Sequence, residues 1–224
     1  MKLAMTDLET TGIDPTLSEI LEIASVLVDF DGFKMTPQGH YHAYIQTDTK
    51  ANMNDKFVVD FQLGLYEKCN KLSKENNLEN VKKGFKNFLK EKFGNSLPQF
   101  TGQNFSAFDA GYLLNSGFLA KGSKDKNGKM SSTYNYRSLE LQSLILMGHT
   151  QTEMKYTEFI LFCQTLDTET QMPTEGGAHT ALYDCYNQIR FFNGYSNFMN
   201  NSKEERAKIV LEYKSKLQKL VKGA

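Results

Sequence analysis

Residues 5–15 read MTDLETTGIDP and place two carboxylates, those of Asp7 and Glu9, in an otherwise apolar part of the chain. The pattern over residues 2–9 predicts a short β-strand, on which side chains two positions apart point to the same face. Two neighbouring anions repel each other, and burying them without a counter-charge costs free energy. A divalent cation removes that cost, and ligands that are all oxygen suit Mg²⁺ or Mn²⁺ better than zinc. The alternative is an edge strand whose acids face water.

The segments that follow predict an α/β fold, a mixed sheet flanked by helices. Residues 19–30 and 40–46 have strand patterns, so the N-terminal part is expected to form a three-stranded meander with a turn at Asp31-Gly32. Apolar residues at helical spacing begin at Leu78, and Gly94 ends that helix. Further strands are predicted at 99–103 and 133–139, further helices at 106–119, 139–147, 155–166 and 178–194, and a mobile basic surface loop at 121–130.

The last segment predicts a long helix. Ser202 and Glu205 have the spacing of a capping box, which favours a helix start at this point. The lysines between 214 and 222 lie off the apolar stripe, and they either bind nucleic acid or simply solvate the helix. One apolar stripe is formed by Ile209, Val210, Tyr213, Leu217 and Leu220.

Length and composition limit the classes of protein to consider. The 224 residues suit one large domain or one domain with additions, and 26 basic side chains balance 26 acidic ones. This balance argues for a small substrate or a local basic patch rather than a long nucleic-acid track. Three scattered cysteines predict reduced thiols in a cytosolic protein. The sequence shows neither a signal peptide nor a membrane-spanning run, so we expect a soluble, cytoplasmic protein without a membrane partner.

Two later stretches add titratable groups to the first pair. QNFSAFD, residues 103–109, places Asp109 near the start of a helix that follows a strand. A carboxylate there is also explained by its favourable interaction with the helix N-terminus. HTALYD, residues 179–184, places His179 at the mouth of a helix and Asp184 inside it. On its own, His179 is explained as an ordinary loop histidine.

Taken in order, DLETTG, QNFSAFD and HTALYD resemble the three motifs of the DEDDh 3'–5' exonucleases, which belong to the ribonuclease H-like superfamily. The resemblance runs over residues 2–198. It implies an exonuclease domain at 1–198 with a mixed five-stranded sheet flanked by helices. It leaves 199–224 as a C-terminal basic amphipathic helix, either part of that domain or appended to it.

The resemblance also implies a reaction. Asp7, Glu9, Asp109 and Asp184 would hold two divalent ions, Mg²⁺ or Mn²⁺, and His179 would be the general base. Two ions about 4 Å apart make a nucleophile from water at neutral pH and support the leaving 3' oxygen. A histidine suits the removal of a proton from the attacking water. The products would be nucleoside 5'-monophosphates, released one at a time from a 3' end.

Two branches of the family share features with this chain. DLETTG and the NxxxFD form of the second motif are similar to proofreading-type DNA exonucleases, although Gln103 stands where that branch usually has His. YNYRSLELQSL is similar to oligoribonucleases, which carry a Tyr-Arg pair like Tyr136 and Arg137 near the bound dinucleotide, followed by an acid like Glu140. That branch implies a homodimer. A Trp- and His-containing stretch typical of oligoribonucleases is missing, which puts a strict dinucleotide preference in doubt.

The resemblance implies further substrate contacts. Thr10 and Thr11 would touch the sugar of the terminal nucleotide, or form a plain turn. Ile13 would insert between the last two bases, or pack in the core. Phe108 would contact the terminal base, or pack a helix on the sheet. Asn104 of the second motif is also assigned to substrate binding.

We therefore expect an enzyme, a 3'–5' exonuclease that is oligoribonuclease-like and acts on single-stranded or short oligonucleotides of RNA, DNA or both. The alternative within the family is a proofreading-type DNA exonuclease. A different class of function is a non-catalytic nucleic-acid-binding subunit with the same fold. A third interpretation is a soluble α/β domain whose acids are only surface charge.

Overall fold

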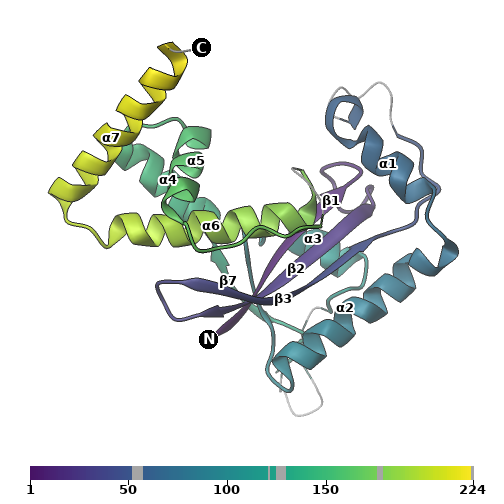
Figure 1. The fold of residues 1–224 in the computed structure, drawn as a ribbon. Coiled ribbons are helices and arrows are strands. Elements are labelled where there is room, and N and C mark those ends of the chain that lie inside the picture. The colour runs from purple at the N-terminus through teal and green to yellow at the C-terminus, as the bar shows by residue number, and fades with distance from the viewer. Residues whose placement is uncertain (52–57, 121, 125–129, 176–178, 223–224) are drawn as a thin grey trace.

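The computed structural model describes residues 1–51, 58–120, 122–124, 130–175 and 179–222. Its centre is a five-stranded mixed sheet with the strand order β3-β2-β1-β4-β7 (Figure 1). β1 pairs antiparallel with β2 and parallel with β4, so it is hydrogen-bonded on both sides. The predicted fold class is confirmed. The strands are β1 (Lys2–Thr10), β2 (Ile20–Phe30), β3 (Met35–Tyr44), β4 (Gln99–Gly102) and β7 (Asn135–Glu140).

Helices cover both faces of the sheet. Helix α6 crosses one face, with α4 and α5 beside it, while α2 and α3 cover the other (Figure 1). The alternation along β1 produces this division, because Leu3 and Met5 pack towards α6 and Ala4 and Leu8 pack towards α2 and α3. The helices are α1 (Leu63–Asn70), α2 (Leu78–Phe93), α3 (Asp109–Asn115), α4 (Leu141–Thr152), α5 (Tyr156–Leu166), α6 (Ala181–Met199) and α7 (Lys203–Lys222).

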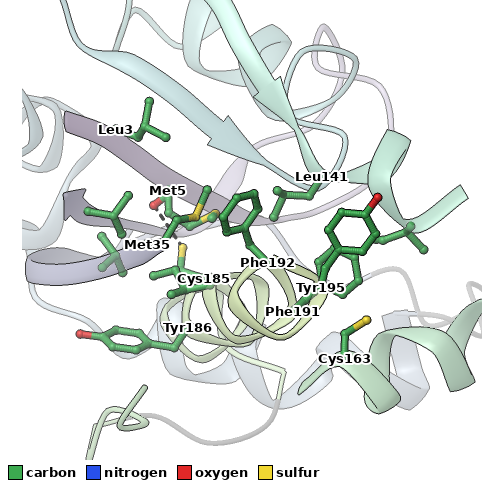
Figure 2. Close-up of a cluster of buried hydrophobic side chains, with 14 of the residues drawn as sticks. Leu3, Met5, Met35, Leu141, Cys163, Cys185, Tyr186, Phe191, Phe192 and Tyr195 are labelled. Carbon is green, nitrogen blue, oxygen red and sulfur yellow. Dashed lines mark hydrogen bonds between the residues drawn. The ribbon is translucent and has the colours of Figure 1, made fainter. Parts of the chain in front are cut away.

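The larger apolar core lies between α6 and the sheet. Figure 2 shows Cys185 of α6 reaching the backbone of β1, where its Sγ lies 3.4 Å from the carbonyl oxygen of Met5. Phe191 and Phe192 continue the contact along the helix. All three cysteines are free and buried. This core fixes α6, and with it everything that α6 carries, against the central strand.

The third strand begins at Met35, whereas the sequence pattern predicted a start at His40. The strand includes Pro37 and Gly39, and a proline is accepted here because β3 is an edge strand. A β-bulge absorbs the irregularity, since Val28 pairs with Pro37 and Leu27 pairs with Gly39. The turn before the strand is held by the carboxylate of Asp31, as its Asx pattern requires.

The helix predicted at 106–119 is shorter and spans only Asp109–Asn115. The residues before it form a turn around Asn104, whose φ is 66°. The backbone amide of Ser106 donates to the carboxylate of Glu140 at 2.9 Å instead of joining a helix. At the other end Gly117 adopts a φ of 74°, a conformation that ends a helix.

The bounds of the other helices and strands differ from the predicted ones by a few residues. Residues 139 and 140 belong to β7 rather than to α4, and α6 runs from Ala181 to Met199. Helix α1, after a short π-helix at Val58–Gln62, was not predicted. The predicted loop at 121–130 lies largely outside the described residues, although Ser123–Lys124 and Met130–Ser131 pair as β5 and β6.

Helix α7 begins with the predicted capping box. The amide of Ser202 donates to the Glu205 carboxylate at 2.9 Å, and the amide of Glu205 donates to the Ser202 hydroxyl at 3.2 Å. The ring of Tyr213 meets that of Phe162 at 5.0 Å, which seats the first half of α7 against α5. Among the described residues, no helix is long and apolar enough to cross a membrane.

Candidate active site

Two carboxylates stand near the C-terminal end of β1, the central strand. Asp7 lies opposite Ala24 of β2, which packs against α6, so Asp7 and Glu9 share the face that α6 covers. Asp184 lies in the first turn of α6. One carboxylate oxygen from each of Asp7, Glu9 and Asp184 lies within 4.8 Å of the others. Three acids from two distant parts of the chain therefore converge.

Asp109 lies beside these acids at the start of α3. It is 4% exposed, and the backbone amides of Leu8 and of Asp109 itself donate to its carboxylate. Among the described residues, the group within 4.8 Å does not include Asp109. Its charge nevertheless raises the pKa of Asp7, which places the two carboxylates in one electrostatic cluster. The structure thus brings together all four acids of the three motifs.

Burial and mutual repulsion dominate the electrostatics of this cluster. Burial, then the charges of Glu22 and Asp184, raises the pKa of Glu9 to about 7. Burial likewise raises the pKa of Asp109 to about 8, and it holds the pKa of Asp7 well above its usual range. The ion-free cluster therefore holds protons at a pH where ordinary carboxylates are ionised. A cation would release those protons and compensate the charges.

Glu22 is a further acid beside the cluster, and the sequence interpretation did not include it. It lies directly opposite Glu9 in the β1–β2 register, and its side chain is 0% exposed. One carboxylate oxygen lies 2.7 Å from Nε2 of His42. The signal for it was the same as for the first pair, an acid inside an apolar strand.

Neutral amides orient three of the carboxylates. Nε2 of Gln188 donates to Oδ1 of Asp7 at 2.9 Å, and Asn187 lies 3.4 Å from Oδ1 of Asp184. The side chain of Gln62, next to α1, hydrogen-bonds to Glu9. These donors fix the carboxylates without neutralising them, so the negative charge stays available to a cation. None of the three amides was predicted from the sequence.

His179 stands just outside α6. Thr180 caps the helix, because its hydroxyl accepts from the amide of Tyr183 at 3.3 Å. This cap leaves His179 exposed in the preceding turn with a φ of 65°, an uncommon conformation for a residue other than glycine. Burial raises the pKa of the Asp184 carboxyl, and the hydrogen bond from Asn187 and the nearby His179 imidazole partly oppose that rise. The helix start thus places a basic side chain beside the acids, on the solvent side.

A cavity of about 570 Å³ opens beside Asp7 and Asp184. It runs between the end of β4 and helices α4, α5 and α6, and its wall is dominated by carboxamides with a few apolar side chains. A volume of this size is typical of small-molecule sites. Besides the two acids it is lined by Gln103, Asn104, Leu141, Gln142, Ile145, Ile160, Gln164, Asn187, Gln188 and Phe191.

The turn after β1 carries three of the residues assigned to substrate contacts. The Thr10 hydroxyl donates to the Gly12 carbonyl at 2.7 Å, and that of Thr11 accepts from the Glu19 amide at 2.8 Å. Both hydroxyls therefore hold the turn together. Ile13 does not pack in the core, because it is 88% exposed at the tip.

The other assigned residues lie in two places. Asn104 lines the cavity, and the half-buried Phe108 packs on Tyr112 with ring centroids 5.1 Å apart. Arg137 is exposed on the edge strand β7 and is not among the cavity residues. Tyr136 lies on the same strand, and its side chain is not among those that the structure describes. The following acid, Glu140, binds Ser106 and so shapes the loop before α3.

The mixed sheet, its two helical layers and the acids at the end of its central strand are the arrangement that the resemblance to ribonuclease H-like exonucleases predicted. The model of the exonuclease family RNase T matches residues 5–192, so the chain belongs to this family of exonucleases. The predicted membership of an exonuclease family is thereby confirmed. No curated protein sequence matches the chain.

Solved structures of nucleases share this fold. Cell-death related nuclease 4 (CRN-4) has a TM-score of 0.56 at 15% identity, covering 89% of this chain and 64% of its own. Zinc-bound E. coli ExoI with ssDNA has a TM-score of 0.53 at 14% identity, covering 95% and 42%. The nuclease domain of 3'hExo, a DEDDh family member bound to rAMP, has a TM-score of 0.52 at 14% identity, covering 85% and 88%. The chain thus spans less than two thirds of the first two.

The raised pKa values predict how stability depends on pH. Folding raises the pKa of Glu9 from 4.5 to about 7. This difference corresponds to about 3 kcal/mol in the free energy of unfolding. The folded chain binds this proton more tightly than the unfolded chain does, so the ion-free protein loses this stability between about pH 4.5 and 7. We expect the ion-free chain to melt at a lower temperature at pH 8 than at pH 5.5.

The variant Glu9→Gln should show a flatter decline over the same range, because it lacks this titrating group. Adding Mn²⁺ at pH 8 should restore the melting temperature of the wild type. The measurement is thermal unfolding in EDTA or Mn²⁺ at several pH values. If the melting temperature of the wild type falls no more steeply with pH than that of Glu9→Gln, the raised pKa does not belong to Glu9.

Proposed function

We propose that the protein is a divalent-metal-dependent 3'–5' exonuclease that releases nucleoside 5'-monophosphates from short or single-stranded nucleic acid. The observation that carries this proposal is the convergence of Asp7, Glu9 and Asp184 within 4.8 Å, with Asp109 beside them. Their donors are all carboxylate oxygens, and no lysine or arginine of the described residues is among the groups that shift their pKa values. Both properties fit Mg²⁺ or Mn²⁺, with two ions per site.

The four acids would hold the ions, and His179 would accept the proton of the attacking water. When bound, the ions supply Lewis-acid activation of water and stabilise the charge that develops on the phosphate. His179 is exposed on the open side of Asp184, where it can exchange a proton with solvent between turnovers. Backbone amides of Leu8 and Asp109 hold the carboxylate of Asp109 in place.

The shape and charge of the site support a short substrate. The cavity next to the acids is lined by amides and apolar side chains, and no lysine or arginine is among the described residues that line it. A long phosphate backbone is normally tracked by such cations. We therefore favour an oligoribonuclease-like activity over a proofreading-type one. Structural neighbours include a nuclease bound to rAMP and one bound to ssDNA, which is compatible with either sugar.

The test is a release assay on 5'-labelled RNA and DNA oligomers from two to about twenty nucleotides. With Mn²⁺ we expect shortening by single nucleotides from the 3' end and nucleoside 5'-monophosphates as products. Chelation by EDTA should stop the reaction. Full activity in EDTA, or binding without cleavage in Mn²⁺, would refute the proposal, and the second result would indicate a non-catalytic binding subunit.

The same assay separates the two branches of the family. A steep rate increase towards dinucleotides selects the oligoribonuclease-like activity. A flat length profile, or a preference for DNA, selects the proofreading-like activity instead.

A further inference from the structure

Gln188 uses both ends of its amide. It lies on α6 one turn after Asp184 and is 9% exposed. Its Nε2 donates to Oδ1 of Asp7 at 2.9 Å, and its Oε1 accepts from the backbone amide of Gln103 at 2.8 Å. A backbone N–H only donates and an ionised carboxylate only accepts, so the amide fits in one orientation. Neither a purely donating nor a purely accepting side chain could replace it.

The second contact connects Asp7 to the far wall of the cavity. Gln103 directly follows β4, and its own Nε2 donates to the Tyr156 hydroxyl of α5 at 2.7 Å. That hydroxyl lies 2.6 Å from Oε1 of Gln142 on α4. A continuous series of hydrogen bonds therefore runs from the carboxylate on the central strand to α5 and α4, two of the helices that bound the cavity.

Close backbone packing makes the arrangement compact. A Cβ added at Gly102 would meet the carbonyl oxygen of Thr6 at 2.9 Å and Oε1 of Gln188 at 3.5 Å. Only a glycine lets β4 approach β1 so closely. The amide of the next residue, Gln103, is thereby brought within reach of α6.

We propose that Gln188 is a positioning residue for hydrolysis, which holds the carboxylate of Asp7 in its ion-binding orientation and couples it to the loop that begins at Gln103. The proposal rests on the proposed function. The neutral amide of Gln188 occupies one lone pair of the Asp7 carboxylate. The remaining lone pairs and the full negative charge of that carboxylate stay available to the cation. A lysine or arginine at this place would compete with the ion instead.

Two substitutions separate the two contacts. Gln188→Glu keeps the length and an acceptor for the Gln103 amide, but it replaces the donor to Asp7 by an oxygen. Gln188→Met keeps the length and removes both contacts. If the side chain served only to satisfy the Gln103 amide, Gln188→Glu would behave like the wild type. Gln218 on α7 is exposed, and the same two replacements there are the matched controls.

The experiment titrates each ion-free protein with Mn²⁺ by calorimetry and measures kcat, KM and thermal unfolding. We expect the Mn²⁺ affinity of both position-188 variants to fall by about 10- to 100-fold. Their kcat should fall at limiting Mn²⁺, with KM for the oligonucleotide nearly unchanged, and both Gln218 variants should match the wild type. If Gln188→Met does not fold, the Mn²⁺ affinity of Gln188→Glu alone tests the proposal.

Two results would overturn the proposal while the exonuclease function stands. One is wild-type Mn²⁺ affinity in the folded Gln188→Met variant. The other is an affinity of Gln188→Glu at or above that of the wild type. If the wild-type chain itself neither binds Mn²⁺ nor releases nucleotides, the proposed function fails and the role of Gln188 falls with it.

Discussion

Replacing Asp7 by Asn is expected to abolish nucleotide release and, at the same time, to raise the melting temperature of the ion-free protein. Asp7 is the acid on which the others converge, since burial and then the charges of Asp109, Asp184 and Glu9 raise its pKa. Removing one ligand from a site that stabilises the reacting phosphate by several kcal/mol lowers the rate by at least about a thousandfold. An amide in its place removes the repulsion within the buried cluster, so the ion-free fold becomes more stable.

The measurements are release of nucleoside 5'-monophosphates in Mn²⁺ and thermal unfolding in EDTA. Asp29→Asn is the control, because Asp29 is exposed at the other end of β2 and should leave both quantities unchanged. A variant that loses activity and is also destabilised without ions would show that Asp7 supports the fold rather than a cation site. A variant that retains activity would contradict the catalytic assignment.

The second large effect is expected from His179→Ala. A general base contributes typically about 10²- to 10⁴-fold, and we expect a loss in that range. Binding of Mn²⁺ should stay close to that of the wild type, because the imidazole stands on the solvent side of Asp184 and is not one of the oxygen donors. Loss of rate without loss of ion affinity is the signature that separates a base from a ligand.

Calorimetric titration with Mn²⁺ and the release assay are run on the same samples. His40→Ala serves as control, since His40 is exposed on β3. Should the His179→Ala variant bind Mn²⁺ much more weakly, the histidine would have to be reassigned to the ion site. An unchanged rate would remove it from the mechanism.

Local spacing was enough to predict part of this site. Asp7 and Glu9 are two apart on a strand, so their common face follows from strand geometry. The resemblance of the later motifs supplied Asp109, His179 and Asp184. Local pattern also located most elements, because apolar periodicity reports directly on which face is buried.

Features that depend on contacts between distant segments could not be predicted. Glu22 faces Glu9 only because of the β1–β2 register, and Gln188 reaches Asp7 only because α6 packs on the sheet. Helix α3 begins later than predicted because the amide of Ser106 donates to Glu140 of β7. In each case the deciding partner is more than ten residues away, where spacing along the chain carries no information about distance.

The place of β1 in the sheet has a consequence for how turnover is timed. Asp7 and Glu9 sit on β1, which pairs with β2 along its length and with β4 at Ala4 and Met5, whereas Asn104 and His179 occupy single turns with left-handed backbone. We therefore expect the motions that admit a substrate or expel a product to occur in the turns rather than in the strand. Related chains could evolve faster or slower enzymes by editing those turns, with the geometry of the acids inherited unchanged.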